Sequence, residues 1–190
     1  MELKASNTER NLLTAFAGES QARNRYTFFS SQARKEGLEQ IAGIFLETAE
    51  NEREHAKQLF KYLQGGSAEI TASFPAGVIG ETATNLEAAA AGERYEHTEM
   101  YPAFSKAALE EGFDEIAKTF RSIAVAERQH EKRYNALLTN VREGKVFKKD
   151  VVVKWKCRNC GYVMEGAIPP LVCPACQHAQ AYYEPWAENY

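Results

Sequence analysis

Cysteine is missing from most of this 190-residue chain, because no cysteine precedes Cys157. Disulfides therefore cannot stabilise the larger part of the chain, and a chain of this length can bury a hydrophobic core without them. Long apolar runs are also lacking, since no segment approaches the roughly eighteen apolar residues that cross a bilayer. Charged residues interrupt the first twenty residues, which excludes the continuous apolar segment of a secretory signal. We therefore expect a cytoplasmic protein with no membrane partner.

A strong excess of charge is lacking as well. Lys and Arg number 23 and Asp and Glu number 26, which gives a net charge of −3. Proteins that bind nucleic acids usually carry a basic excess, so we expect no nucleic-acid partner. Hydrophobic residues make up 44% and charged residues 26%, as is ordinary for a globular protein.

An internal repeat is present. A shift of 74 residues superposes the first part of each half, and a shift of 75 superposes the remainder. The matched pairs that carry chemistry are Glu19 with Glu93, Tyr26 with Tyr101, Glu52 with Glu127 and His55 with His130. Chance agreement between two amphipathic helices is the alternative, but matched Gly, Tyr and His residues disfavour it. The one-residue change in shift predicts an insertion in the third helix, and such insertions often form π-bulges.

Each half is predicted to be a helix, a tight turn and a second helix. Gly37 and Gly112 stand where a helix ends in a left-handed residue. Segment 6–9 has the form of a capping box that would begin the first helix, and segment 84–87 matches it near the third helix. A glycine-containing segment, 64–80, then forms a long crossover between the halves. This arrangement predicts a mainly α protein with a ferritin-like four-helix bundle.

The composition changes after the last helix. Cys, Gly, Pro, Trp and Tyr accumulate from about residue 153, just after a β-favouring valine run. We expect a helical bundle over 1–145, a linker over 146–152 and a small second domain over 153–190.

Two Glu-x-x-His pairs predict a metal site within the bundle. Residues three apart share one face of a helix, so Glu52 and His55 point the same way, as do Glu127 and His130. One pair alone is weak evidence, because exposed helices are rich in glutamate. Two pairs at equivalent repeat positions, with Glu19 and Glu93 on the preceding helices, match the ligand pattern of di-iron carboxylate bundles. Buried carboxylates need cations between them, and imidazole is a donor that suits iron.

Glu96 and the two matched tyrosines extend this prediction. Glu96 lies in the inserted stretch, and its repeat partner is Ala22. It is either a seventh ligand or an exposed glutamate. Tyr26 and Tyr101 either donate hydrogen bonds to ligating carboxylates or simply pack in the core.

The four cysteines form two Cys-x-x-Cys pairs separated by twelve residues. Such a pair of knuckles binds one metal through four thiolates, and by itself it suits zinc or iron. A redox-active di-iron site on the same chain would need electrons, which favours iron. The predicted ligands are Cys157, Cys160, Cys173 and Cys176.

The chain resembles the rubrerythrin family over nearly its whole length. The resemblance rests on the segments 15–26, 52–57, 92–102 and 126–133 and on the two cysteine knuckles in that order. It implies a ferritin-like bundle followed by a rubredoxin-like domain. It also implies two non-haem iron ions bridged by oxo and carboxylate groups, and one iron in the four-cysteine site. The implied di-iron ligands are Glu19, Glu52, His55, Glu93, Glu96, Glu127 and His130.

The resemblance also implies how the site works. In this family one iron exchanges a histidine for a glutamate as the redox state changes, and the matching residues are His55 and Glu96. The residues expected to take part in catalysis are Glu19, Glu52, Glu96, Tyr26 and Tyr101. One departure is the short spacer between the knuckles. Another is Gln177, which follows the last cysteine where rubredoxins usually have glycine.

The expected function is reduction of hydrogen peroxide to water, with a role in protection from oxidative stress. Electrons would come from NAD(P)H through a reductase or a rubredoxin-like partner, then through the four-cysteine iron. We expect a homodimer or tetramer, because a helix of about 30 residues is roughly 45 Å long and places the tail of one chain far from its own di-iron site. The alternatives are a ferroxidase or iron-handling protein, and an interaction protein stabilised by zinc.

Overall fold

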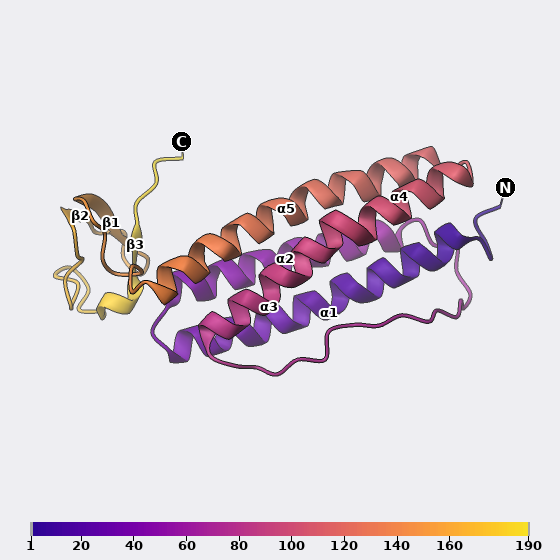
Figure 1. Ribbon diagram of the computed structural model, residues 1–190. Helices are drawn as coiled ribbons and strands as arrows, with labels where there is room; N and C mark the ends of the chain where they lie inside the picture. Colours follow the sequence, from indigo (N-terminus) through magenta and orange to yellow (C-terminus); the bar gives the residue numbers. More distant parts are fainter. Residues whose placement is uncertain (1, 190) are drawn as a thin grey trace.

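The computed structural model describes residues 2–189, which form a long helical bundle with a small β domain at one end (Figure 1). The first helical hairpin consists of α1 (Asn7–Lys35) and α2 (Glu39–Phe60). The second consists of α3 (Thr82–Tyr95), a π-helical turn η1 (Glu96–Met100), α4 (Tyr101–Glu110) and α5 (Asp114–Arg142). Since α3, η1 and α4 are continuous, the prediction of a mainly α four-helix bundle is confirmed. None of the helices described is both long and apolar enough to cross a membrane.

The turns of the two hairpins have the same geometry. Gly37 has φ +73° and Gly112 has φ +84°, so both use the left-handed conformation that glycine adopts most readily. Directly after each glycine, a backbone N–H reaches back to the preceding helix. Leu38 donates to Ala33 O at 2.9 Å, and Phe113 donates to Ala108 O at 2.8 Å. The predicted helix ends are therefore confirmed.

A second pair of hydrogen bonds joins the helices within each hairpin. The Ser30 hydroxyl donates to Ala42 O at 2.9 Å, and the Ser105 hydroxyl donates to Ala117 O at 2.9 Å. Each serine and each acceptor is 75 residues from its counterpart. The sequence repeat is thus a repeat of structure.

The two predicted capping boxes have different outcomes. Ser6 caps α1, because its hydroxyl accepts the Glu9 N–H at 3.0 Å. The second segment, 84–87, lies near the start of the third helix but does not cap it, because α3 begins at Thr82 and the segment is inside the helix. Here the carboxylate of Glu36 accepts the Thr82 N–H at 3.0 Å. A side chain from the end of α1 therefore takes the place of a local cap.

The predicted insertion is confirmed as η1. The backbone N–H of Tyr101 donates to the carbonyl of Glu96, five residues earlier. One extra residue is thereby accommodated in the wider turn.

Two hydrophobic clusters fill the bundle. One, at the end nearer the β domain, includes Tyr26, Phe45 and Tyr134, and the other, toward the opposite end, includes Leu12 and Phe120. Four buried glutamates lie between these clusters along the bundle. The core is therefore interrupted by a polar layer, which forms the candidate site.

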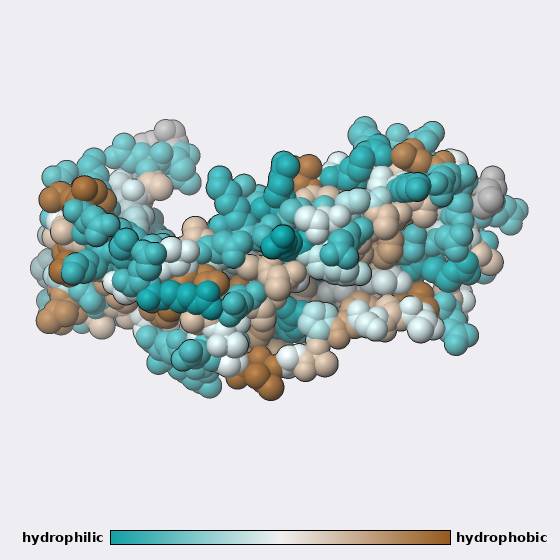
Figure 2. Space-filling view, in the orientation of Figure 1, coloured by the Kyte–Doolittle hydropathy of each residue, from teal (hydrophilic) through white to brown (hydrophobic). Residues whose placement is uncertain are grey.

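The crossover passes along the outside of the bundle (Figure 1). It carries exposed apolar side chains, including Phe74, Val78 and Ile79. Figure 2 shows a small brown patch at the lower edge of the molecule, beside pale and teal residues.

The tail is a three-stranded antiparallel sheet of order β2-β1-β3. Its elements are β1 (Val153–Cys157), β2 (Val163–Gly166), a 3₁₀ turn η2 (Gln180–Tyr182) and β3 (Tyr183–Pro185). The sheet domain contacts α2, where the guanidinium of Arg158 occupies the space that a side chain at Gly43 would need.

The helices end at Arg142 and the first strand begins at Val153. The predicted division at 145 and 153 into separate folding units stays a prediction. Residues 1 and 190, the outer ends of the predicted ranges, lie outside the described residues.

Candidate metal centres

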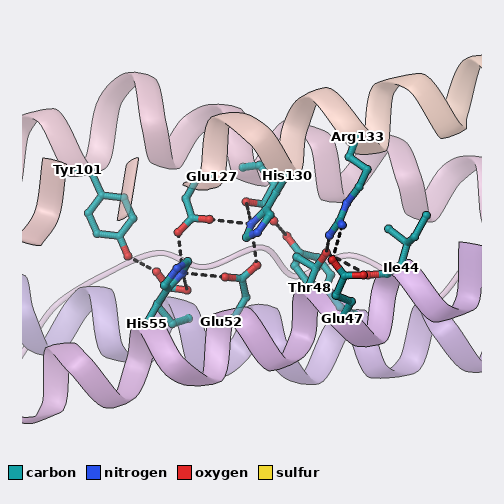
Figure 3. Close-up of polar contacts among 12 residues, drawn as sticks. Ile44, Glu47, Thr48, Glu52, His55, Tyr101, Glu127, His130 and Arg133 are labelled. Atoms are coloured by element: carbon teal, nitrogen blue, oxygen red, sulfur yellow. Dashed lines mark hydrogen bonds and ion pairs between the residues drawn. The ribbon is translucent and has the colours of Figure 1, made fainter. Parts of the chain in front are cut away.

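The polar layer consists of one glutamate from each helix of the bundle. Glu19, Glu52, Glu93 and Glu127 are each 0–1% exposed, and His130 is 6% exposed. Helical spacing places each histidine three residues after a glutamate on the same face, so both imidazoles point into the layer (Figure 3).

These side chains form two overlapping groups of donor atoms. The first group is Glu19, Glu52, His55 and Glu127, and the second is Glu52, Glu93, Glu127 and His130. In each group the donor atoms lie within 4.8 Å of one another. Because Glu52 and Glu127 belong to both groups, their two-oxygen carboxylates are placed to join neighbouring cations. The arrangement is that of a dinuclear carboxylate and histidine site.

The donor atoms are close together but poorly satisfied. His55 Nδ1 lies 3.0 Å from Glu52 Oε2 and 2.9 Å from Glu127 Oε1, while His130 Nδ1 lies 2.8 Å from Glu127 Oε2. Even so, within residues 2–189 both imidazole Nδ1 atoms and both oxygens of Glu52 and Glu127 have no hydrogen bond of good geometry. Buried polar atoms of this kind normally have partners. Lone pairs that converge without donors fit a pair of cations.

Without cations, protons must offset the charge. Burial and the neighbouring Glu127 raise the pKa of Glu19 to about 8. Burial opposes protonation of His130, but Glu127, Glu52 and Glu93 raise its pKa to about 12. The pKa of His55 is also raised, again by Glu127, Glu19 and Glu52 against the effect of burial. Metal binding at this site must therefore displace protons.

Two buried tyrosines connect the hairpins through this layer. The Tyr26 hydroxyl of α1 donates to Glu93 Oε1 of α3 at 2.5 Å. In return, the Tyr101 hydroxyl of α4 donates to Glu19 of α1 (Figure 3). Each tyrosine thus orients the carboxylate of the opposite hairpin. Of the two alternatives left by the sequence, both tyrosines donate hydrogen bonds to carboxylates of the layer.

Glu96 lies beside the site but outside both groups. It lines a cavity of about 290 Å³ between α1, the helix that contains η1, and the crossover residues Thr71–Pro75. Burial, followed by the charges of Glu93 and Glu19, raises the pKa of Glu96 well above its usual range. The structure therefore brings together six of the seven predicted di-iron ligands, with His55 inside the cluster and Glu96 facing the cavity.

The four cysteines converge in the tail. Their sulfurs all lie within 4.8 Å of one another, with Cys157 Sγ 3.8 Å from Cys176 Sγ and Cys160 Sγ 3.7 Å from Cys173 Sγ. Cys157 and Cys173 are buried, whereas Cys160 is exposed. This is a four-thiolate site with one accessible edge.

The two knuckles differ at the residue that follows the second cysteine. Gly161 has φ +80°, and Gln177 has φ +61° at the equivalent position. A left-handed conformation costs a non-glycine residue about 1–2 kcal/mol. The departure at Gln177 therefore strains the second knuckle without preventing the cysteines from converging.

Comparison with known proteins agrees with these sites. The rubrerythrin family model matches residues 10–138, and the model for the rubrerythrin rubredoxin-like domain matches residues 155–184. The chain belongs to the rubrerythrin family. Rubrerythrin from Porphyromonas gingivalis is 62% identical over 99% of this chain and 94% of its own length. Rubrerythrin from Nitratidesulfovibrio vulgaris is 60% identical, covering 96% of this chain and 95% of its own.

Solved structures extend the comparison to the fold. The fully reduced, all-ferrous state of nigerythrin is 31% identical, with a TM-score of 0.64 over 97% of this chain and 89% of that one. Bacterioferritin from Mycobacterium tuberculosis is 19% identical, with a TM-score of 0.64 over 75% of this chain and 90% of that one. This second likeness concerns the fold alone. Both support the predicted ferritin-like bundle, and the rubredoxin-like nature of the tail is confirmed by the family match.

One interaction near the rubrerythrin site was not anticipated from the sequence. His97 has no repeat partner, and no role follows from its position alone. In the structure, its Nε2 lies 2.6 Å from Glu131 Oε2 on α5. The signal that could have found it was its place within the inserted stretch.

Proposed function

We propose that the chain is a hydrogen peroxide reductase that holds two iron ions in the bundle and one in the four-cysteine site. The observation that carries this proposal is the position of Glu96. A half-buried carboxylate faces a cavity beside a dinuclear site, where a small oxidant has room to approach. Reduction of one peroxide to two waters consumes two electrons and two protons.

The residues have separate roles in this proposal. Glu19, Glu52, His55, Glu93, Glu127 and His130 would hold the two ions, with Glu96 available to exchange for His55. When bound, ferrous ions supply Lewis acidity and the electrons that cleave the O–O bond. Glu96 holds a proton on the cavity side, where it can be given to a departing oxygen.

Tyr26 and Tyr101 keep Glu93 and Glu19 in place by their hydrogen bonds. A carboxylate fixed in this way needs little reorganisation when charge changes nearby. Glu52 belongs to both donor groups, so its carboxylate would respond to a change at either ion.

The four-cysteine iron would return electrons to the bundle. The exposed edge at Cys160 is where a reductase or rubredoxin-like donor, supplied by NAD(P)H, would make contact. Within one chain, the tail contacts α2 at Gly43, twelve residues before His55. At 1.5 Å per residue this separation is about 18 Å along the helix, before the tail's own width is added. A homodimer or tetramer in which one tail lies near a partner's cluster would shorten the path.

The test compares oxidants on the reduced protein. We expect stoichiometric hydrogen peroxide to oxidise the diferrous protein much faster than dioxygen does. Visible absorption measures the rate of oxidation in both cases. Glu96→Gln should slow the peroxide reaction at least about tenfold, as expected for loss of a general acid. Glu99→Gln is the matched control, because Glu99 is an exposed glutamate on the same turn.

Two results would count against the proposal. Equal rates with dioxygen and peroxide would instead support a ferroxidase or iron-handling protein. A Glu96→Gln rate equal to that of Glu99→Gln would remove Glu96 from the chemistry.

A further inference from the structure

The π-helical turn η1 interrupts the regular α-helical hydrogen bonding of the helix that carries Glu96. The turn exchanges regular helical hydrogen bonds for the wider bond from the Tyr101 N–H to Glu96 O. Within the turn, the Thr98 hydroxyl donates to Arg94 O at 2.6 Å. Both bonds are local to this helix. The Tyr26–Glu93 and Tyr101–Glu19 hydrogen bonds hold the helix against α1 on either side of the turn, but neither of them joins the turn to α5. A polar contact between the turn and α5 comes from other side chains.

His97 and Glu131 supply such a contact. The imidazole Nε2 of His97 lies 2.6 Å from Glu131 Oε2. Since a carboxylate accepts, the imidazole N–H donates, and the short distance is typical of a bond to a charged group. The side chains are only 14% and 19% exposed, so solvent competes weakly. His97 directly follows Glu96, and Glu131 directly follows His130. One bond therefore links the backbone beside Glu96 to the backbone beside a donor of the cluster.

The repeat provides an internal comparison. In the first hairpin the residue equivalent to Glu131 is Ala56, which has no carboxylate, and the residue equivalent to Glu96 is Ala22. Helix α1 passes this region without interruption. The residue equivalent to His97 is Arg23, whose guanidinium lies 3.7 Å from Glu50 of α2 in an exposed ion pair. The short, shielded bond of His97 to Glu131 therefore occurs in the half that contains the π turn, whereas the other half has a longer, exposed pair.

We infer that His97 is a positioning residue for Glu96. Its hydrogen bond to Glu131 ties η1 to α5 and keeps the Glu96 side chain between the cluster and the cavity. The bond acts through the backbone of η1, since His97 belongs to neither donor group. Its effect on peroxide turnover rests on the proposed function, whereas its effect on η1 does not.

The experiment removes each partner and measures two properties. Amide hydrogen exchange over residues 96–101 reports opening of the turn. The rate at which saturating peroxide oxidises the diferrous protein reports the placement of Glu96. We expect His97→Ala and Glu131→Ala each to raise exchange about tenfold and to slow oxidation about tenfold. The double variant should be no worse than either single variant, because both remove the same bond.

Two further variants separate positioning from general stability. His97→Gln keeps an N–H donor and should restore most of both properties. Arg142→Ala removes the bond to Glu87, an exposed ion pair of 2.8 Å that also joins α5 to α3. It should change neither property, because it lies far from η1 along α5 and exposed pairs contribute little.

Three outcomes would overturn the inference. They are exchange in His97→Ala no faster than in Arg142→Ala, additive effects in the double variant, and faster exchange with an unchanged oxidation rate. If the parent protein does not prefer peroxide to dioxygen, the proposed function fails. Exchange over residues 96–101 and its rescue in His97→Gln then still confirm or overturn the link between η1 and α5.

Discussion

The two helical hairpins of the bundle are nearly equivalent, and their main difference is one residue inserted in the second hairpin. Both turn at a left-handed glycine, and both use a serine hydroxyl to join their helices. Each sends a tyrosine to a glutamate of the other hairpin. The first hairpin nevertheless begins with an unbroken helix of 29 residues, whereas the second is interrupted by η1.

The π turn changes only the side of the site that the second hairpin forms. The common frame places equivalent donors around two positions, and the π turn adds Glu96 to the second hairpin alone. Duplication thus places the donors for a cation pair, and the local irregularity adds Glu96, the residue on which the proposed reductase function rests.

The largest effect is expected at Glu52 and Glu127, which contribute to both donor groups. Glu52→Ala or Glu127→Ala should remove both ions from the bundle, while Glu19→Ala or Glu93→Ala should weaken one position. Iron per chain measures this, and the four-cysteine site should keep its ion in every case. Glu54→Ala is the control, because the Glu54 side chain is 52% exposed on α2. Retention of one bundle ion in Glu52→Ala would contradict a shared role.

An intermediate effect is expected from pH on the metal-free protein. The folded-state pKa of Glu19 is raised to about 8 and that of His130 to about 12, so the folded state binds more protons than the unfolded one. Stability should therefore fall as pH rises from about 4.5 to 8 through Glu19, and from about 6.5 upward through His130. Melting temperatures of the metal-free protein between pH 5 and pH 9 test this sign.

The hairpins can be compared in the same measurement. The pKa of Glu93 is also raised, by burial and by Glu52, so Glu19→Gln and Glu93→Gln should both flatten the dependence on pH. A metal-free protein that becomes more stable between pH 5 and pH 8 would contradict the prediction. Loading with metal should reverse the trend, since cations then replace the protons.

The smallest effect is expected at the two turns. Gly37→Ala and Gly112→Ala should each lower the free energy of unfolding by about 1–2 kcal/mol, because each has a positive φ. A Cβ at Gly112 meets nothing within 4 Å, and one at Gly37 meets Ala181 Cβ at an ordinary 3.7 Å. Denaturant unfolding of the metal-free protein should therefore show similar losses.

Gly77→Ala is the control for the turns, since Gly77 has no positive φ and open space around it. It should cause no loss. A loss at one turn more than twice the loss at the other would show that the hairpins are less alike than their geometry indicates.

Much of this arrangement could be predicted from local sequence. Gly37 and Gly112 mark helix ends because few other residues adopt their backbone conformation, and the change of shift before Tyr101 reveals the π turn. Glu-x-x-His spacing aims donors at one face regardless of tertiary structure. These features depend on the chain within a few residues, so the sequence is enough to predict them.

Other features depend on contacts between distant segments. Glu36 caps α3 from the far end of α1, and no local pattern announces it. Similarly, the sequence leaves open whether Tyr26 contacts a carboxylate or only packs in the core, and the contact with Glu93 of the opposite hairpin follows from the packing of the bundle. His and Glu are both possible ligands, so the sequence does not decide which of His55 and Glu96 points into the cluster. Packing sets these side-chain directions.

The sharing of donors between hairpins has a consequence for the order of assembly. Helices α1 and α2 meet through a short turn, so this hairpin can form quickly from local contacts, as can the second. Neither hairpin alone holds a complete donor group, because each group takes ligands from both. Each hairpin supplies three donors of one group and needs the fourth from the other hairpin. We therefore expect the ions to be held by all their ligands only after the two halves have met, so that metal binding stabilises the assembled bundle more than either hairpin.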